Sequence, residues 1–293
     1  NHSFSSKPRE GYKNYYEKMT TYAAIISNQA QSIDPNVTAT TFPVIETEES
    51  ESIFNYFDTA SSRAEIDAVT SKLAHGKIGI VGLGGTGSYV LDLVAKTPVM
   101  EIHLFDGDKF LNHNAFRSPG APSLEELRNN PQKVDYFKEL YSKMHRNIIA
   151  HNCFIDASNV DLLQGMNFFF LCLDRGDAKR AIVEKLEELH VSFIDVGMGV
   201  QLVDDALLGV LRITTSTIEK REHVRSKNRI PFSDGDGGND YSRNIQIADL
   251  NALNAALAVI KWKKLFGFYR DLENEYFSTY TIDGNALFNE EKL

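Results

Sequence analysis

The sequence predicts an α/β protein built on a Rossmann-like, mostly parallel sheet flanked by helices and preceded by a helical N-terminal extension. Two observations support this fold class. From residue 77 onward, short apolar runs alternate with helical patterns, which is typical of a parallel sheet with crossover helices. The run at 78–81 is followed at once by a glycine-rich turn and a helix, where nucleotide-binding sheets place their anion-binding turn.

Composition limits the classes of protein to consider. The chain has 293 residues, of which 42% are hydrophobic and 24% charged, so it can build an ordinary globular core. Its 31 Lys and Arg residues against 40 Asp and Glu residues give a net charge of −9, which argues against a nucleic-acid partner. The 2 cysteines are too few for a disulfide framework or an all-cysteine zinc site.

The apolar runs and the start of the chain bear on its compartment. No apolar run is long enough to span a bilayer, and residues 1–9 lack the pattern of a signal peptide. We therefore expect a cytoplasmic protein with no membrane partner. Because the chain begins with Asn rather than Met, we also expect it to be a fragment or a processed form.

Two regions are expected along the chain. Residues 1–73 should form a mainly helical extension, with helical spacing of apolar residues over 14–29 and a second helix over 62–75. Residues 74–293 should form the sheet domain. Its predicted strands are 78–81, 101–105, 168–173, 191–196, 206–213 and 278–282, and its predicted helices are 87–96, 132–146, 177–190 and 245–266. The polar stretch 214–241 is expected to be a long mobile crossover loop.

The glycine-rich turn carries the first chemical signal. The chain here has the sequence Gly82-Leu83-Gly84-Gly85-Thr86-Gly87. Small residues let the backbone approach an anion, and the helix N-terminus supplies N–H donors and a positive dipole. Asp106, at the end of the next strand, is placed to bind a ribose. This half-site suits a nicotinamide or flavin enzyme as well as an ATP-binding one.

The polar residues that follow Asp106 favour nucleotidyl transfer. Asp108, Asn114 and Arg117 come soon after the acid, and Lys133 begins the next predicted helix. Arginine, lysine and amide donors suit a triphosphate. Asp174 follows another apolar strand, and carboxylates at the carboxyl ends of parallel strands meet at the ligand crevice, where Mg²⁺ binds on phosphates.

Residues 77–199 resemble the ThiF/MoeB/HesA adenylyltransferases, whose core is shared with ubiquitin-activating enzymes. The family pattern is a GxGGxGS turn, an Asp-x-Asp pair, an Asn, an Arg, a downstream Lys and an Asp that closes a later strand. The matching positions are Gly82, Gly84, Gly85, Gly87, Ser88, Asp106, Asp108, Asn114, Arg117, Lys133 and Asp174. Several motifs matched in order are far more specific than a glycine turn alone.

The resemblance implies a role for each matched residue. The glycines and the Asp106/Asp108 pair would bind ATP, with Asp106 on the ribose. Asn114, Arg117 and Lys133 would contact the phosphates, and Asp174 would bind Mg²⁺. Arg63 would reach into the site of the partner in a homodimer. The expected catalytic residues are therefore Arg117, Lys133, Asp174 and Arg63.

The resemblance also implies a reaction and partners. The expected activity is ATP-dependent adenylation of the C-terminal carboxylate of a ubiquitin-like or sulfur-carrier protein that ends in Gly-Gly. A conjugating enzyme is a further expected partner. The N-terminal extension resembles those of bacterial activating enzymes encoded beside ubiquitin-like proteins.

Four departures from the family pattern matter. Ser118 stands where Gln usually follows the arginine, and Arg175 stands where Asn is common. The zinc-binding CxxC pairs are absent, and the stretch 214–241 has no cysteine. Cys153 and Cys172 are interpreted as structural residues. The acyl group would then pass to a partner's thiol, to a cysteine that precedes the present chain, or to a hydroxyl such as Ser226 or Ser233.

Three other functions remain as alternatives. A tRNA-modifying member of the same family is disfavoured by the acidic charge. A catalytically degenerate scaffold that binds a ubiquitin-like protein is disfavoured by the intact set of polar residues. A nicotinamide oxidoreductase is disfavoured by the polar cluster after Asp106.

Overall fold

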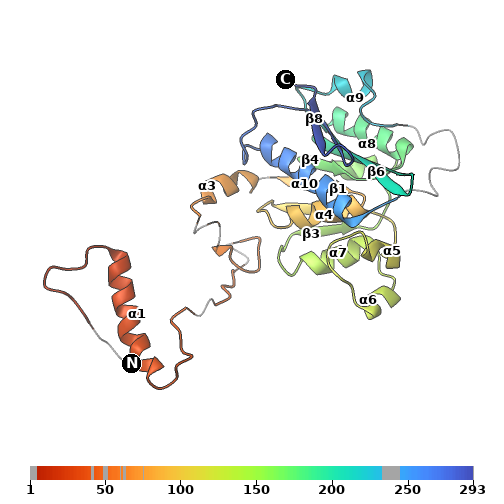
Figure 1. Cartoon of the computed structure of the whole chain (residues 1–293). Coiled ribbons are helices and arrows are strands. Elements are labelled where there is room, and N and C mark those ends of the chain that lie inside the picture. Colours follow the sequence, from red (N-terminus) through yellow and green to blue (C-terminus); the bar gives the residue numbers. More distant parts are fainter. Residues whose placement is uncertain are drawn as a thin grey trace. The chain divides into compact units, whose positions relative to one another are not determined.

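The computed structural model describes residues 5–40, 43–48, 52–59, 61, 64–74, 76–232 and 245–292. Internal contacts divide the chain into two compact units, Asn1–Ile45 and Glu46–Leu293 (Figure 1). Residues 46–73 are thus counted with the second unit, and the expected domain boundary after residue 73 stays a prediction.

The first unit contains one long helix, α1 (Tyr15–Gln31), which confirms the helix expected over 14–29. Its start is set by local hydrogen bonds. The Asn14 side chain accepts from the Glu17 N–H at 2.8 Å, and the Glu17 carboxylate accepts from the Lys13 N–H at 2.7 Å. Such reciprocal caps satisfy backbone donors that the first helical turn leaves free.

The second unit is organised around a single sheet, and within the described residues it has eight strands in the order β3-β2-β1-β4-β5-β6-β7-β8. The neighbours from β3 to β5 are parallel, and those from β5 to β8 are antiparallel. In chain order the strands are Lys77–Val81, Glu101–Phe105, Ile148–His151, Phe168–Leu171, Ser192–Val203, Ala206–Ser216, Phe277–Thr281 and Ala286–Glu290. This arrangement confirms the predicted Rossmann-like, mostly parallel fold.

Helices cover both faces of the parallel part (Figure 1). On one face, α4 (Gly85–Val94), α7 (Lys133–Tyr141) and α10 (Ala248–Leu265) share a core with the sheet. On the other, η2 (Val160–Leu163), α8 (Gly176–Glu188) and α9 (Glu222–Ser226) contribute to a second core. The middle strand β4 has the sequence Phe-Phe-Phe-Leu and is at most 1% exposed. Each of its phenylalanines contributes about 1.5–3 kcal/mol through burial.

Several short elements complete the second unit. The region expected to be helical over 62–75 contains α3 (Asp67–Thr70) and η1 (Ser71–Leu73). Two further helices, α5 (Asn112–Ala115) and α6 (Leu124–Arg128), lie between β2 and α7. None of the helices in the described part of the chain is long and apolar enough to cross a membrane.

The stretch 214–241 is more regular than a mobile loop where the structure describes it. Residues 214–216 complete β6, and α9 follows at Glu222–Ser226. Thr214, Thr215 and Ser216 are nearly fully buried, because they pair with neighbouring strands instead of leaving the sheet. Residues 233–241 lie outside the described residues, and with them Ser233.

Candidate active site

The glycine turn lies between β1 and α4, at the carboxyl edge of the parallel strands. Gly82 adopts a φ of +90°, and a Cβ there would lie 2.7 Å from the Cys172 carbonyl oxygen. A Cβ on Gly87 would lie 1.9 Å from the Gly82 carbonyl oxygen. Backbone atoms therefore pack closely against the turn at Gly82 and Gly87. A Cβ on Gly84, by contrast, would meet nothing within 4 Å, which leaves that backbone open to a ligand.

Asp106 holds this turn in place. The residue is 6% exposed, and its two carboxylate oxygens accept from the Leu83 N–H at 2.7 Å and the Asp108 N–H at 2.8 Å. The Lys133 Nζ lies 3.5 Å from Asp106 and 2.7 Å from Asp108. Lys133 itself is 6% exposed at the first position of α7. The structure thus brings together the first acid pair and the lysine predicted from the sequence.

Asn114 and Arg117 present two buried donors with no hydrogen-bond partner among the described residues: Asn114 Nδ2 and Arg117 Nε. Asn114 Oδ1 accepts from the Leu111 N–H at 2.9 Å, which orients the amide. Burial lowers the pKa of Arg117, and the negative charges of Asp174 and Asp108 oppose this shift. Burial and the positive charges of Arg117 and Lys133 also lower the pKa of His113. Unpartnered donors in a positive environment suit a phosphate group.

A small depression of about 60 Å³ lies between Arg117 and Asp174, the acid predicted to follow β4. Its lining includes Gly84, Gly85 and Thr86 from the turn, together with Arg117 and Asp174. Arg63, the remaining predicted catalytic residue, lies outside the described residues. Of the other predicted site residues, Gly82 and Gly87 belong to the turn itself, and Asp106, Asp108 and Lys133 are joined to it through the contacts given above. Asn114 lies three residues before Arg117 in the chain.

Two asparagines of α10 that were not predicted also contact this region. Asn251 and Asn254 are both 0% exposed. Asn251 Oδ1 accepts from the Thr86 hydroxyl at 2.9 Å, and Asn254 lines the depression. The sequence did contain a pattern that could have indicated them. Two asparagines three residues apart lie on the same face of a helix, and this helix is otherwise apolar and rich in alanine.

A third missed residue is the aromatic Phe154, which follows β3. The side chain is 47% exposed and packs so closely on Gly107 that a Cβ there would lie 2.8 Å from its ring. The Arg175 guanidinium lies 5.9 Å from the ring centroid. An exposed ring beside Asp106 offers a flat apolar surface next to the expected ribose position.

The two cysteines are free thiols. Burial raises the pKa of Cys172, and nearby Asp195 adds to that effect. Burial and the charge of Asp156 raise the pKa of Cys153. Because the thiolate is the nucleophile, both environments disfavour covalent chemistry, in agreement with the structural interpretation of these residues.

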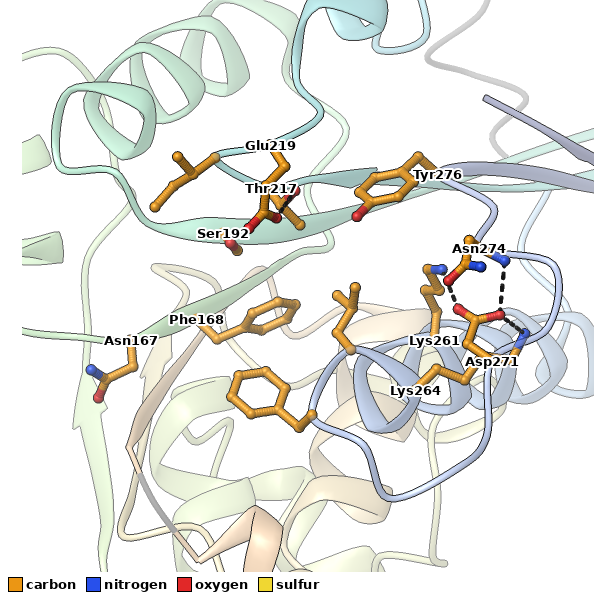
Figure 2. Close-up of a pocket in the computed structure, with 13 residues that line it drawn as sticks. Asn167, Phe168, Ser192, Thr217, Glu219, Lys261, Lys264, Asp271, Asn274 and Tyr276 are labelled. Atoms are coloured by element: carbon orange, nitrogen blue, oxygen red, sulfur yellow. Dashed lines mark hydrogen bonds and ion pairs between the residues drawn. The ribbon is translucent and has the colours of Figure 1, made fainter. Parts of the chain in front are cut away.

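A larger pocket of about 390 Å³ lies at the amino-terminal ends of β4 and β5 (Figure 2). Phe168 and Ser192 begin these strands, and Lys261 and Lys264 of α10 pair with Asp271 at 2.9 and 3.4 Å. None of the residues predicted to bind nucleotide lines this pocket. It lies at the edge of the sheet opposite the glycine turn.

Comparison with known families identifies the sheet domain. Residues 62–201 match the model described as the ThiF family, and residues 1–59 match a domain of unknown function, DUF6791. The family model that matches residues 62–201 is thus the family that the motifs of this region resemble. No curated protein matches the chain.

Solved structures share the fold at low sequence identity. The structure of Escherichia coli MccB with ATP has a TM-score of 0.59 and 19% identity, covering 80% of this chain and 72% of that one. The microcin C7 biosynthetic enzyme MccB in complex with N-formylated MccA has a TM-score of 0.61 and 19% identity, covering 76% and 66%. Selenomethionine PaaA has a TM-score of 0.59 and 16% identity, covering 95% and 86%.

Proposed function

We propose that the protein catalyses ATP-dependent adenylation of the C-terminal carboxylate of a ubiquitin-like or sulfur-carrier protein ending in Gly-Gly. The observation that carries the proposal is the unpartnered donor Arg117 Nε, in a residue that lines one depression with the open backbone of Gly84. A second unpartnered donor, Asn114 Nδ2, lies three residues earlier in the chain. The solved MccB structures with ATP and with N-formylated MccA support it, because a similar fold there binds both a nucleotide and a second ligand.

In this proposal each polar group of the site has one task. Asp106 binds the ribose, while Asn114, Arg117 and Lys133 bind the phosphates. Phe154 stacks on the base, a contact that contributes about 1–3 kcal/mol where aromatic side chains bind nucleobases. The carrier's own carboxylate attacks the α-phosphorus and pyrophosphate leaves. The protein accelerates the step by positioning both groups and stabilising charge.

Asp174 is the proposed Mg²⁺ ligand. The described residues contain no cluster of three or more His, Cys, Asp or Glu side chains that could hold a metal ion. A single carboxylate nevertheless fits Mg²⁺, which commonly binds one or two carboxylates and completes its shell with water and substrate phosphates. Mg²⁺ would neutralise phosphate charge at this edge of the sheet.

The activated acyl group then leaves the protein or moves to a residue outside the described part. The raised pKa of both Cys153 and Cys172 supports transfer to a partner's thiol, such as that of a conjugating enzyme. A homodimer is part of the proposal, because Arg63 would act in the partner's site.

ATP–pyrophosphate exchange with a Gly-Gly-ended ubiquitin-like protein tests the proposed function. We expect exchange by the wild type and a loss of about 100-fold or more in Arg117→Ala, in line with the removal of one stabilising donor. Arg117→Lys keeps the charge but loses the planar donor fork, so we expect only partial recovery. ATP binding without exchange for any carrier would instead favour the scaffold alternative.

A further inference from the structure

Asn254 is an unexplained polar group in the depression that holds Arg117 and Asp174. Its Nδ2 donates to the Gly197 carbonyl oxygen of β5 at 3.1 Å, which fixes the orientation of the amide. The residue is 0% exposed, and its Oδ1 has no hydrogen-bond partner among the described residues. Because an unpartnered buried amide oxygen is unfavourable, the position favours a ligand that brings a donor.

The chemistry of an amide oxygen narrows the choice of ligand group. It accepts hydrogen bonds and cannot donate them. Ionised phosphate oxygens and a carboxylate are acceptors too, so neither pairs with Asn254 Oδ1. A group that forms a hydrogen bond with it must therefore carry an N–H or an O–H.

Strand order separates Asn254 from the expected ribose. Asp106 follows β2, whereas the carbonyl that holds Asn254 belongs to β5. The order β2-β1-β4-β5 places three strand spacings between them, a distance of about 14 Å. A ribose hydroxyl bound to Asp106 therefore lies too far away to donate to Asn254. Of the two substrates, the second one is then the candidate source of the donor.

We propose that Asn254 Oδ1 accepts a hydrogen bond from the amide N–H of the substrate's last residue. This inference rests on the proposed function and deepens it. The N–H lies two bonds from the carboxyl carbon, so a chain end that presents its carboxylate beside Arg117 also carries a donor into the depression. Met198 lines the same depression, and its flexible, unbranched side chain can move to admit the chain end. The substrate class is thus a chain end whose last peptide bond is a secondary amide.

Two synthetic peptides test the proposal directly. Both have eight residues; one ends in Gly-Gly, and in the other glycolate replaces the last glycine, so that an ester oxygen stands where the N–H was. We expect the wild type to bind the amide peptide about 10-fold more tightly. Asn254→Ala should bind both equally. Fluorescence anisotropy measures the affinities, with and without a non-hydrolysable ATP analogue.

Asn251→Ala is the matched control. Asn251 is equally buried one turn earlier on α10, but its Oδ1 already accepts a hydrogen bond from the Thr86 hydroxyl. This variant should therefore keep the wild-type preference for the amide peptide. Circular dichroism compares the folding of the variants. If Asn254→Ala does not fold, the preference of the wild type for the amide peptide over the ester peptide decides whether the proposal holds.

Several results would overturn the proposal. These are no preference in the wild type, a preference that survives in Asn254→Ala, or no binding of either peptide. Equal weakening of both peptides in Asn254→Ala, together with a raised Mg²⁺ requirement, would assign Oδ1 to a metal-bound water. An amide preference without ATP–pyrophosphate exchange would contradict the proposed function and leave this inference standing.

Discussion

Asp106 shows how one side chain can serve both stability and the site. Each of its oxygens accepts a backbone N–H, from Leu83 and from Asp108. Asp106→Asn replaces one acceptor by an NH₂ group that faces a donor. We expect the free energy of unfolding to fall by about 1–3 kcal/mol, measured by urea denaturation, with weaker ATP binding.

The neighbouring Asp108 is the control for that change. Its side chain is 56% exposed and pairs with Lys133 at 2.7 Å. Because the Asp108 side chain is largely exposed and Lys133 keeps a second carboxylate, Asp106, at 3.5 Å, Asp108→Asn should destabilise the protein less than Asp106→Asn. Equal losses in the two variants would contradict the structural role given to Asp106.

His145 is a second residue at which one side chain should affect the stability of the fold, here in a pH-dependent way. It is fully buried; its Nε2 lies 2.9 Å from the Val99 carbonyl oxygen, and its Nδ1 accepts from the Asn147 N–H at 3.2 Å. Burial lowers the pKa of His145 below its ordinary value of 6.5. The folded state therefore binds the proton less readily than the unfolded state, so this contribution to stability is present above about pH 6.5 and falls with decreasing pH.

His145→Gln should remove that dependence. We expect the variant to lose stability at pH 7.5 and to show a smaller further loss between pH 7 and 5 than the wild type. Thermal unfolding at a series of pH values measures both. Parallel curves for the two proteins would show that His145 does not cause the dependence.

At the scale of elements, the glycine turn depends on close backbone contacts. A Cβ on Gly87 would lie 1.9 Å from the Gly82 carbonyl oxygen, and backbone cannot move aside as a flexible side chain can. Gly87→Ala should cost about 1–3 kcal/mol of stability or more and abolish ATP binding. Gly84→Ala, where a Cβ meets nothing within 4 Å, should keep the wild-type stability. Urea denaturation compares the two.

The contact between α10 and the segment that follows it depends on the charge of Asp271. Partial burial opposes ionisation of Asp271, but hydrogen bonds from Lys261 and the Asn274 N–H, with the charges of Lys261 and Lys264, lower its pKa to about 2. The unfolded value is 3.8. The stabilisation is therefore complete above about pH 4 and is lost as the pH falls toward 2.

Asp271→Asn tests this contact. The variant should unfold at a lower temperature than the wild type at pH 7, and the difference should shrink between pH 4 and pH 2. Thermal unfolding monitored by circular dichroism measures it. A difference that does not change with pH would mean that Asp271 stabilises the contact without its charge.

At the scale of the whole molecule, the proposed homodimer can be tested by mixing two inactive variants. If Arg63 acts in the partner's site, each mixed dimer of Arg63→Ala and Arg117→Ala contains one intact site. If the subunits pair at random, half of the dimers are mixed, and one of the two sites in each mixed dimer is intact. The mixture should then show about a quarter of the wild-type ATP–pyrophosphate exchange activity. No restoration would contradict action across the dimer, and light scattering gives the oligomeric state independently.

Much of the fold could be predicted because its signals are local. The apolar run at Phe168 and the glycines after Val81 define a buried strand and a strand–turn–helix unit by themselves, and the structure places β4 and α4 there. The strands β3 and β8 were not predicted. Ile148–His151 has only two large apolar residues, which are adjacent, and Ala286–Glu290 carries exposed apolar side chains. Neither segment therefore has an apolar pattern long enough to identify it.

The sequence by itself determined the class of sheet, the anion-binding turn and the order of the polar residues around it, because those features depend on side chains near one another in the chain. Only the tertiary structure decided that Asn254 faces Gly197 and that its oxygen lacks a partner. Nearly sixty residues separate these two positions, and no local pattern encodes which groups meet when a distant helix packs on the sheet. The substrate's chain end is therefore proposed from packing, whereas the nucleotide site is proposed from the motif.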